Sequence, residues 1–576
     1  MLFFASFQHD FELLGLLAWV ALVPWLFVAL RADRTTAIVT SYGTTFLYHL
    51  LGLSWIGLVT GPGWIATTFL EGFYSVAIVL AVRWMRRITA LPVSVLLPPL
   101  WVMGEHHRGA HLWFIKFPWL LIGQTQHART NLIQICDLTS IYGLSFLVVL
   151  VNAFVIDVLL LLAERNAAEK DLDDKDKRYL LKLAIYPVAL LLLANLYGLI
   201  RTGQVERATI EGPKLLAVQC DVPQELKEDL TRDPARELAS QNFAVTEAAL
   251  QAIKDDKERP DAILWSETVW MYPFNYEYPS WDLFRKAWID RRQPGWGAWV
   301  VEMNQRLFGT ATRHNTDLIF GAYDRGPMED WLDDDDKKSH HLANRVWQIG
   351  PLPDPKTGKC VREHYDKINL VPASEGIPGK TGDWFHDFIK SFVPQGFQTL
   401  EPGDEPHVMT LGRPRPDGEH WKINCDICFE ISFPELIREG TLKGADVHFC
   451  PSNDGWFHTS DDISSAEIPL ALDHAVFRAI ENRRGFVRIV NRGITCFIGP
   501  TGEVLQEVSG MRRTPAGPVP SKLYVTGSIM ANVPTTHLTT VYVQIGDTFA
   551  WLCWVASIGL IALSFQRRRT AAPSPS

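Results

Sequence analysis

The sequence is poor in cysteine and lacks a surplus of positive charge. Its 576 residues include 8 cysteines, too few for a fold built on disulfide bonds. Acidic residues outnumber basic ones by 64 to 55, and no basic stripe is interleaved with aromatic residues, which argues against nucleic-acid binding. Charged residues make up 21% and hydrophobic residues 47% of the chain, which excludes a disordered or fibrous protein. A chain of this length is expected to form more than one structural block.

Long apolar runs are abundant, and they crowd toward the two ends of the chain. A helix needs roughly 20 apolar residues to cross the hydrocarbon core of a bilayer. One such run is compatible with a buried helix of a soluble domain, but a series of them with almost no charge predicts a polytopic α-helical membrane block. The predicted spans are Leu13–Leu30, Ala37–Ile56, Trp64–Val82, the short and proline-rich Leu91–Met103, Tyr142–Leu162, Tyr179–Ile200 and Thr548–Phe565.

Lysine and arginine cluster after alternate spans, which predicts the orientation of the chain. If these clusters are cytoplasmic, the uncharged loop Thr60–Gly63 and the long central stretch both fall outside. We find no cleavable signal peptide, so the first spans are expected to direct insertion. The chain is therefore divided into a transmembrane block at 1–200, an extracytoplasmic domain at 201–546, and a last transmembrane helix with a basic cytoplasmic tail at 547–576.

The central stretch alternates short apolar runs, typical of buried strands, with helical patterns. This alternation favours a layered sheet with helices on its faces. The helical patterns are Glu237–Ile253 and Pro469–Asn482, whereas Arg325–His341 and Gly379–Gly403 fit neither pattern and are interpreted as insertions. The predicted strands are Leu215–Gln219, Ala262–Trp265, Asp317–Gly321, Trp421–Cys428, Val447–Cys450, Phe486–Val490 and Thr495–Ile498.

Two segments of this domain place a charged residue beside an apolar run. Glu267 follows a predicted strand, and a carboxylate that is partly buried at a cleft is a usable general base. Lys367 precedes an apolar segment, where a fixed ammonium stabilises an oxyanion or a thiolate. Taken alone, each residue is better explained without a catalytic role. Glu267 would then be a surface carboxylate, and Lys367 would be an exposed lysine paired with Asp366 or Glu375.

A third segment carries a cysteine, Cys428, at the end of a predicted strand and before a turn and a helix start. This pattern is typical of a nucleophile elbow, where backbone N–H groups lower the pKa of a thiol and bind an oxyanion. The alternatives are a buried structural cysteine, or a disulfide or metal site shared with Cys425. Strand positions three apart face opposite ways, which disfavours that pairing. No second Cys/His pair accompanies them, so a zinc site is not expected.

The segment Cys428–Leu436 resembles the nucleophile motif of the nitrilase superfamily, and Glu267 and Lys367 match that superfamily's glutamate and lysine in chain order. The resemblance implies an α-β-β-α sandwich and a Glu267–Lys367–Cys428 triad in a catalytic domain at 201–546. Membrane spans on both sides resemble the bacterial apolipoprotein N-acyltransferases, and this likeness covers nearly the whole chain. It also rests on Glu105 and Arg108, Phe117–Trp119 with Gln124, Gln219 and Pro223 with Lys227, Leu370–Pro372, Ser452–Phe457 and Asn491–Thr495.

Several positions depart from that family's usual residues. Glu228 stands where the family has tryptophan, Ser266 where it has proline, and Phe429 where it has tyrosine. These departures bear on substrate-contacting loops more than on the triad. Further departures are Ala373–Ser374 before Glu375, Leu470–Ala471 in place of a Gln-His pair, and a first helix that is missing or reduced to Met1–Phe7.

The resemblance implies acyl transfer from a membrane phospholipid to the N-terminal amine of diacylglyceryl-cysteine in an apolipoprotein, through a thioester on Cys428. Lys367 and the N–H of Phe429 would stabilise the oxyanion, Glu267 would carry the proton, and Glu375 and Glu430 would shape the lysine and cysteine environments. No metal or organic cofactor is expected. The implied location is the bacterial inner membrane, with the catalytic domain on the periplasmic side.

Two other functions share parts of this pattern. A membrane-tethered amidase of the nitrilase type would use the same triad on a small amide, but it needs at most one anchor. A non-catalytic lipoprotein-binding or transporter-like protein would place polar sites within its spans. Glu71 and Asp157 are the clearest intramembrane charges, and neither has a basic partner in its own span.

Overall fold

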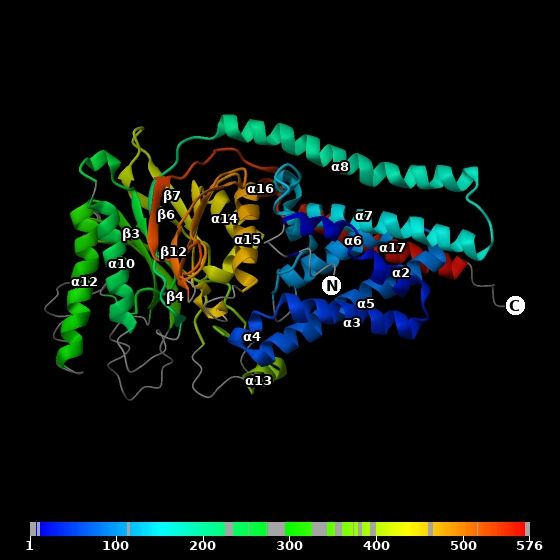
Figure 1. Ribbon diagram of the computed structural model, residues 1–576, viewed down its shortest axis with the longest axis horizontal. Helices are drawn as coiled ribbons and strands as arrows, with labels where there is room; N and C mark the ends of the chain where they lie inside the picture. The colour runs from blue at the N-terminus through cyan, green and yellow to red at the C-terminus, as the bar shows by residue number, and fades with distance from the viewer. Residues whose placement is uncertain are drawn as a thin grey trace. The chain divides into compact units, whose positions relative to one another are not determined.

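The computed structural model describes residues 7, 12–111, 116–224, 234–251, 253–271, 274, 294–324, 342–351, 360–372, 374–377, 383–391, 399–458, 465–514 and 517–570. They divide into two units (Figure 1). Unit 1 comprises Met1–Arg207, Ser465–Asn482 and Thr539–Ser576, and unit 2 comprises Ala208–Ser464 and Arg483–Leu538. The segment Ser465–Asn482 thus groups with unit 1, although its place in the sequence lies within 201–546.

Unit 1 is helical. Its long helices pack through an apolar core to which α2, α5, α6 and α7 contribute, with Leu560 and Ile561 of α17 against it. Polar side chains fix the helix ends, as where Asp33 accepts hydrogen bonds from the N–H groups of Thr35 and Thr36. The elements are η1 (Glu12–Trp19), α2 (Val23–Arg31), α3 (Arg34–Gly52), α4 (Ile56–Val59), α5 (Gly61–Thr89), α6 (Val93–His106), η2 (His107–His111), η3 (Ile122–Gln126), η4 (Leu132–Ile135), α7 (Cys136–Ala167), α8 (Asp174–Ala208), α15 (Glu467–Asn482), α16 (Val541–Ile545) and α17 (Thr548–Thr570).

Five helices in the described part of the chain are long and apolar enough to cross a membrane: Leu13–Arg31, Gly61–Thr89, Leu132–Ala167, Asp174–Ala208 and Thr548–Arg568. They confirm the corresponding sequence predictions. The predicted span Ala37–Ile56 forms α3, but its threonines and serine dilute the apolar character. The predicted span Leu91–Met103 forms α6, whose 14 residues reach only about 21 Å at about 1.5 Å per residue.

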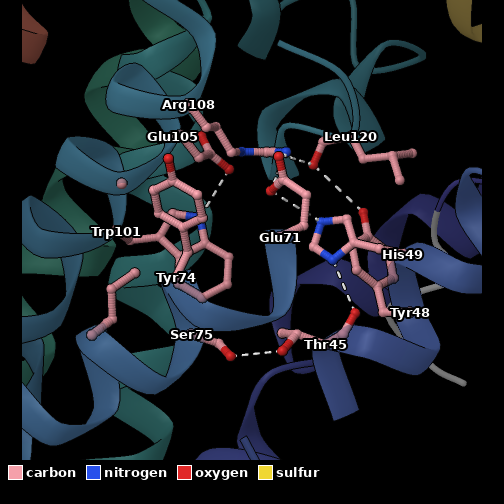
Figure 2. Close-up of a pocket in the computed structure, with 12 residues that line it drawn as sticks. Thr45, Tyr48, His49, Glu71, Tyr74, Ser75, Trp101, Glu105, Arg108 and Leu120 are labelled. Atoms are coloured by element: carbon pink, nitrogen blue, oxygen red, sulfur yellow. Dashed lines mark hydrogen bonds and ion pairs between the residues drawn. The ribbon is translucent and has the colours of Figure 1, made fainter. Parts of the chain in front are cut away.

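The intramembrane charges of unit 1 have partners on other elements. Arg108 donates to Glu71 at 3.3 Å and to the carbonyl of Leu120 at 3.0 Å. His49 lies 3.7 Å from the same Glu71 carboxylate, and Figure 2 shows these side chains converging around a buried cavity. Asp157 accepts hydrogen bonds from the N–H groups of Val93 and Ser94 at the start of α6. The sequence of a single span does not reveal these partners, because they lie on other elements.

Unit 2 contains two six-stranded sheets, in the orders β14-β1-β2-β3-β4-β5 and β11-β10-β9-β8-β7-β6, and a two-stranded hairpin, β12-β13. β1, β2 and β3 pair in parallel, as do β7, β8 and β9. The strands are β1 (Lys214–Gln219), β2 (Ala262–Leu264), β3 (Asp317–Asp324), β4 (Ala343–Ile349), β5 (Val361–Asp366), β6 (Val408–Pro414), β7 (His420–Cys425), β8 (Val447–Ser452), β9 (Gly485–Val490), β10 (Cys496–Ile498), β11 (Val504–Glu507), β12 (Gly510–Thr514), β13 (Gly517–Ser521) and β14 (Gly527–Asn532).

Alternation along the strands sorts side chains into two cores. Leu215 and Ala217 of β1 face a core shared with the second sheet. Leu216 and Val218, the alternate residues, face a core covered by α10 (Pro234–Leu250) and α12 (Pro294–His314). Figure 1 shows α10 and α12 beside the sheet that holds β3 and β4. The remaining elements are η5 (Asp256–Glu258), α13 (Trp384–Lys390), η7 (Cys428–Ser432), α14 (Pro434–Leu442), which packs against β7, and η8 (Asp454–Phe457).

Each predicted strand overlaps an observed one, and both predicted helices are present as α10 and α15. The predicted C-terminal end of the strand Trp421–Cys428 is wrong. β7 stops at Cys425, because the chain turns away from the sheet before Cys428. The interpretation of Gly379–Gly403 as irregular is also wrong in part, since α13 lies within it. The segment Arg325–His341 lies outside the described residues.

Candidate active site

Cys428 lies at a strained turn between β7 and α14. The N–H of Asp426 still donates to the carbonyl of Phe449 on β8, and the chain then leaves the sheet. Cys428 has φ of +54°, a left-handed conformation that residues with a Cβ seldom adopt. Such strain marks sites where a side chain is held for function. Cys428 as a residue is only partly buried, whereas Cys425 is fully buried in the core between the sheets.

The backbone beyond this turn offers donors at the thiol. η7 begins at Cys428, and the first N–H groups of a helix have no acceptor within it. The N–H of Phe429, the next residue in the chain, is therefore a candidate donor to the oxyanion that would form on a substrate carbonyl attacked by Sγ. The ring of Phe429 packs edge-on against Phe433, with ring centroids 5.1 Å apart.

Lys367, Glu267 and Glu375 form a buried charged cluster. Glu267 follows β2 and Lys367 follows β5. The Nζ of Lys367 lies 2.8 Å from Glu375 and 3.5 Å from Glu267. The lysine is fully buried and Glu267 is 5% exposed. A buried ammonium between carboxylates is held at a fixed position, as oxyanion stabilisation requires.

Asn344 completes this cluster. Its Nδ2 donates to Glu267 Oε1 at 2.7 Å and to Glu375 Oε1 at 3.2 Å, and the side chain is fully buried on β4. Sequence reasoning missed Asn344, because neither its strand β4 nor the pairing of β4 with β5 could be predicted from the sequence. The amide fixes the orientation of the Glu267 carboxylate.

The charges of the cluster shift the pKa values of both Lys367 and Cys428. Burial alone would lower the pKa of Lys367, but Glu375 and Glu267 outweigh it and raise that pKa well above its ordinary value. Burial, with the negative charge of Glu267, raises the pKa of the Cys428 thiol well above its ordinary value, although Lys367 and the hydroxyl of Ser452 oppose the shift. The lysine is therefore charged and the thiol neutral at rest.

Glu430 joins the lysine segment to the cysteine turn. Its buried carboxylate accepts hydrogen bonds from the Tyr365 hydroxyl and from the N–H groups of Ile368, Asn369 and Ile427, at 2.7–2.9 Å. Burial raises the pKa of Glu430 to about 7, against the hydrogen bonds from Asn369 and Ile427. These contacts favour a positioning role for Glu430 over a role in proton transfer.

The segment after β8 forms another wall of the thiol site. The hydroxyl of Ser452 contacts the Cys428 thiol and lies 2.8 Å from Asp454. Asp454 forms a buried ion pair with Arg488 at 2.7 Å, and Asn453 is held by Asn491 at 3.0 Å. The sequence reading identified this segment as a family motif but did not foresee the contact between Ser452 and the thiol.

Tyr323 on β3 also belongs to this neighbourhood. Burial raises its pKa, and the charges of Glu267 and Glu375 raise it further. Among the described residues, no group of His, Cys, Asp or Glu has the arrangement of a metal site. Glu228 lies outside the described residues.

Two family descriptions match the chain. Residues 1–154 match the apolipoprotein N-acyltransferase N-terminal domain, and residues 234–514 match carbon-nitrogen hydrolase. An apolipoprotein N-acyltransferase of Geobacter metallireducens is 27% identical over 96% of this chain and 91% of that protein. The enzyme of that name from Borreliella burgdorferi is 26% identical over 93% of this chain and 88% of that protein.

Solved structures resemble the chain in fold. A mutant of the Nesterenkonia AN1 amidase from the nitrilase superfamily is 14% identical, with a TM-score of 0.34, over 60% of this chain and 97% of that one. Saccharomyces cerevisiae Nit3, of the same superfamily, is 16% identical, with a TM-score of 0.31, over 59% and 94%. The carbon-nitrogen hydrolase match, the sheets of unit 2 and the five long apolar helices confirm a helical membrane block joined to a nitrilase-like sandwich.

Proposed function

Since the chain belongs to the apolipoprotein N-acyltransferase family, we propose that it transfers an acyl chain from a membrane phospholipid to the N-terminal amine of diacylglyceryl-cysteine in apolipoproteins, through a thioester on Cys428. The observation that carries the residue assignment is the connection through Glu430. One buried carboxylate ties the turn of Cys428 to the segment of Lys367.

In the first step, Cys428 attacks the ester carbonyl of the phospholipid. Because the thiol is neutral at rest, its proton must leave as the C–S bond forms, and Glu267 accepts it. Lys367 and the N–H of Phe429 stabilise the tetrahedral oxyanion. The C–O bond then breaks, and the leaving lysophospholipid takes the proton from Glu267. The acyl group remains on Cys428 as a thioester.

In the second step, the amine of the apolipoprotein attacks the thioester carbonyl. Lys367 and the Phe429 N–H stabilise the second oxyanion, and Glu267 accepts the proton of the amine. The C–S bond breaks, the sulfur takes that proton, and the amide product leaves. Asn344 keeps Glu267 aimed at the same place in both steps, and Glu375 holds Lys367.

The protein acts in a membrane on lipid and lipoprotein substrates. We assign it to the bacterial inner membrane with unit 2 on the periplasmic side. The support for this orientation is the placement of basic residues, since Arg83, Arg86 and Arg87 end α5 and Arg567 and Arg568 end α17. The likeness to amidases is one of fold at low identity and gives no support to hydrolysis of a small amide.

The proposed function is tested by mass spectrometry of a test lipoprotein. Purified protein is incubated with a diacylglyceryl lipopeptide and a phospholipid of defined chain length, and the mass of the N-terminal peptide is measured. We expect a mass gain of one acyl group with wild type and with Cys425→Ala, and none with Cys428→Ala. Acylation that survives Cys428→Ala, or a thioester mapped to Cys425, would refute the assignment.

A further inference from the structure

A hollow in unit 1 lies at the C-terminal end of α5, apart from the buried cavity of Figure 2. Its volume is about 430 Å³, within the range of small-ligand sites. Residues of α2, α5, α7 and α8 line it, among them Arg83, Arg86 and Arg87 on α5, Asp157 and Glu164 on α7, and Tyr179 on α8. The hollow is therefore rich in guanidinium groups.

The two buried charges of this hollow are used by helix ends. Arg83 donates to the carbonyls of Ala29 and Ala32, which close the last turn of α2. Both oxygens of Asp157 accept N–H groups at the start of α6, Val93 to one and Ser94 to the other. Asp157 therefore repels a bound anion only weakly, because both of its carboxylate oxygens already accept hydrogen bonds from backbone N–H groups.

Arg86 and Arg87 are the groups left to bind a ligand. Arg86 contacts Glu164 at 3.1 Å, but the two side chains are 32% and 64% exposed, and a pair of such exposure is weak. Arg87 is exposed and makes no ion pair within the described residues. Arginine binds phosphate through parallel hydrogen bonds. Arg567 of α17 adds a further positive charge, since it donates to the carbonyl of Thr89.

Beyond the hollow, α8 becomes apolar. α8 is joined to α7 at its two ends, where Asp176 pairs with Arg165 and Tyr197 donates to Asp137. Figure 1 shows α8 running alongside α7. Beyond Tyr179, α8 presents exposed apolar side chains, with Leu181 65% and Ile185 56% exposed. A ligand held here would meet the arginines of the hollow, and the exposed apolar side chains of α8 begin directly beyond Tyr179.

We propose that this hollow binds an anionic phospholipid, with its phosphodiester between Arg86 and Arg87 and its acyl chains along α8. Basic pockets between membrane helices are suited to acidic lipid headgroups. The proposed orientation places the hollow in the cytoplasmic leaflet, and the bound lipid is not the acyl donor. The inference rests on membrane insertion in the proposed orientation and is independent of acyl transfer.

The test is native mass spectrometry of the full chain released from micelles that hold equal amounts of phosphatidylglycerol and phosphatidylcholine with the same acyl chains. We expect wild type to retain phosphatidylglycerol preferentially. The double variant Arg86→Gln/Arg87→Gln should lose about fivefold of this preference per arginine. The control, Arg34→Gln/Lys177→Gln, removes the same charge outside the hollow and should keep the preference.

The single variant Arg87→Gln is the control for misfolding, since this exposed side chain supports no helix end. Its preference for phosphatidylglycerol should fall about fivefold. A second arm adds millimolar inorganic phosphate, which should not displace the lipid. Retention that is equal in wild type and Arg86→Gln/Arg87→Gln, or displacement by free phosphate, would overturn the proposal. Because the readout is lipid retention, a failure of acyl transfer would leave it unaffected.

Discussion

Glu430→Gln offers a sharp test of how the active site is held. Oε1 of Glu430 accepts the N–H groups of Ile368 and Asn369, and Oε2 accepts that of Ile427. A glutamine oxygen can replace one of these oxygens, but its amide NH₂ then faces an N–H donor. Leaving a buried N–H without an acceptor costs about 1–3 kcal/mol. If the cysteine turn bears this cost in the transition state, acyl transfer falls roughly 5- to 150-fold.

The loss should depend on pH. With the pKa of Glu430 raised by burial to about 7, about nine tenths of it is ionised at pH 8 and about one tenth at pH 6. A protonated carboxyl resembles the amide, so wild type and variant should differ more at pH 8 than at pH 6. The measurement is the ratio of their acyl-transfer rates at each pH, in which other titrations cancel.

The free energy of unfolding should also depend on the ionisation of Glu430, but here the protonated form is the favourable one. Because folding raises the pKa of Glu430 from 4.5 to about 7, the folded protein holds this proton more tightly. The stabilisation is complete at low pH and is lost as the pH rises through about 7, and glutamine removes this dependence. Glu435→Gln, at a side chain 48% exposed, is the control for both measurements. A rate ratio that is the same at pH 6 and pH 8 would refute a carboxylate anchor.

The remaining predictions concern the charged cluster and the topology. Lys367→Ala should raise the pKa of the Cys428 thiol, measured by the pH dependence of alkylation with Cys425 replaced, because the cation that opposes the shift is gone; an unchanged value would place the lysine away from the thiol. Glu267→Gln should slow acyl transfer by about 10²–10⁴ while the protein stays folded. Asn344→Ala should raise KM little and lower kcat, as expected when a base is misaimed; a change in KM alone would contradict that role. A phosphatase reporter fused after Gly212 should be active and one fused after Lys175 silent, and the reverse would contradict the orientation.

Strands with runs of buried apolar residues could be predicted from the sequence, and the mostly polar β5 could not. Leu215–Gln219 and Phe486–Val490 are buried on both faces, so their pattern is unambiguous. β5 has one buried residue, Tyr365, among polar neighbours, and its apolar content is too low to predict a strand. Its place in the sheet comes from pairing with β4, which is a tertiary effect.

The residues of the candidate site likewise divide into those that the sequence could predict and those that it could not. Glu267, Lys367 and Cys428 could be proposed from three segments in the right order, but their support could not. Asn344 reaches Glu267 from a residue 77 positions away, and no short motif contains both. Arg108 meets Glu71 in the same way, from a different element, which a search within single spans cannot find. Sequence patterns predict which residues carry chemistry, whereas the contacts that fix them depend on the fold.

In the proposed mechanism, a thiol of raised pKa suits a two-step transfer. A resting thiolate beside Lys367 would be stabilised by the same ammonium that must stabilise the oxyanion, so attack would give up that interaction. A neutral thiol leaves the ammonium available, and Lys367 then interacts most strongly when negative charge moves to the carbonyl oxygen. The carboxylates of Glu375 and Glu267 keep Lys367 protonated throughout. Phe429 directly follows Cys428 in the chain, so in the proposed mechanism both oxyanions would form against the same two donors, Lys367 and the Phe429 N–H.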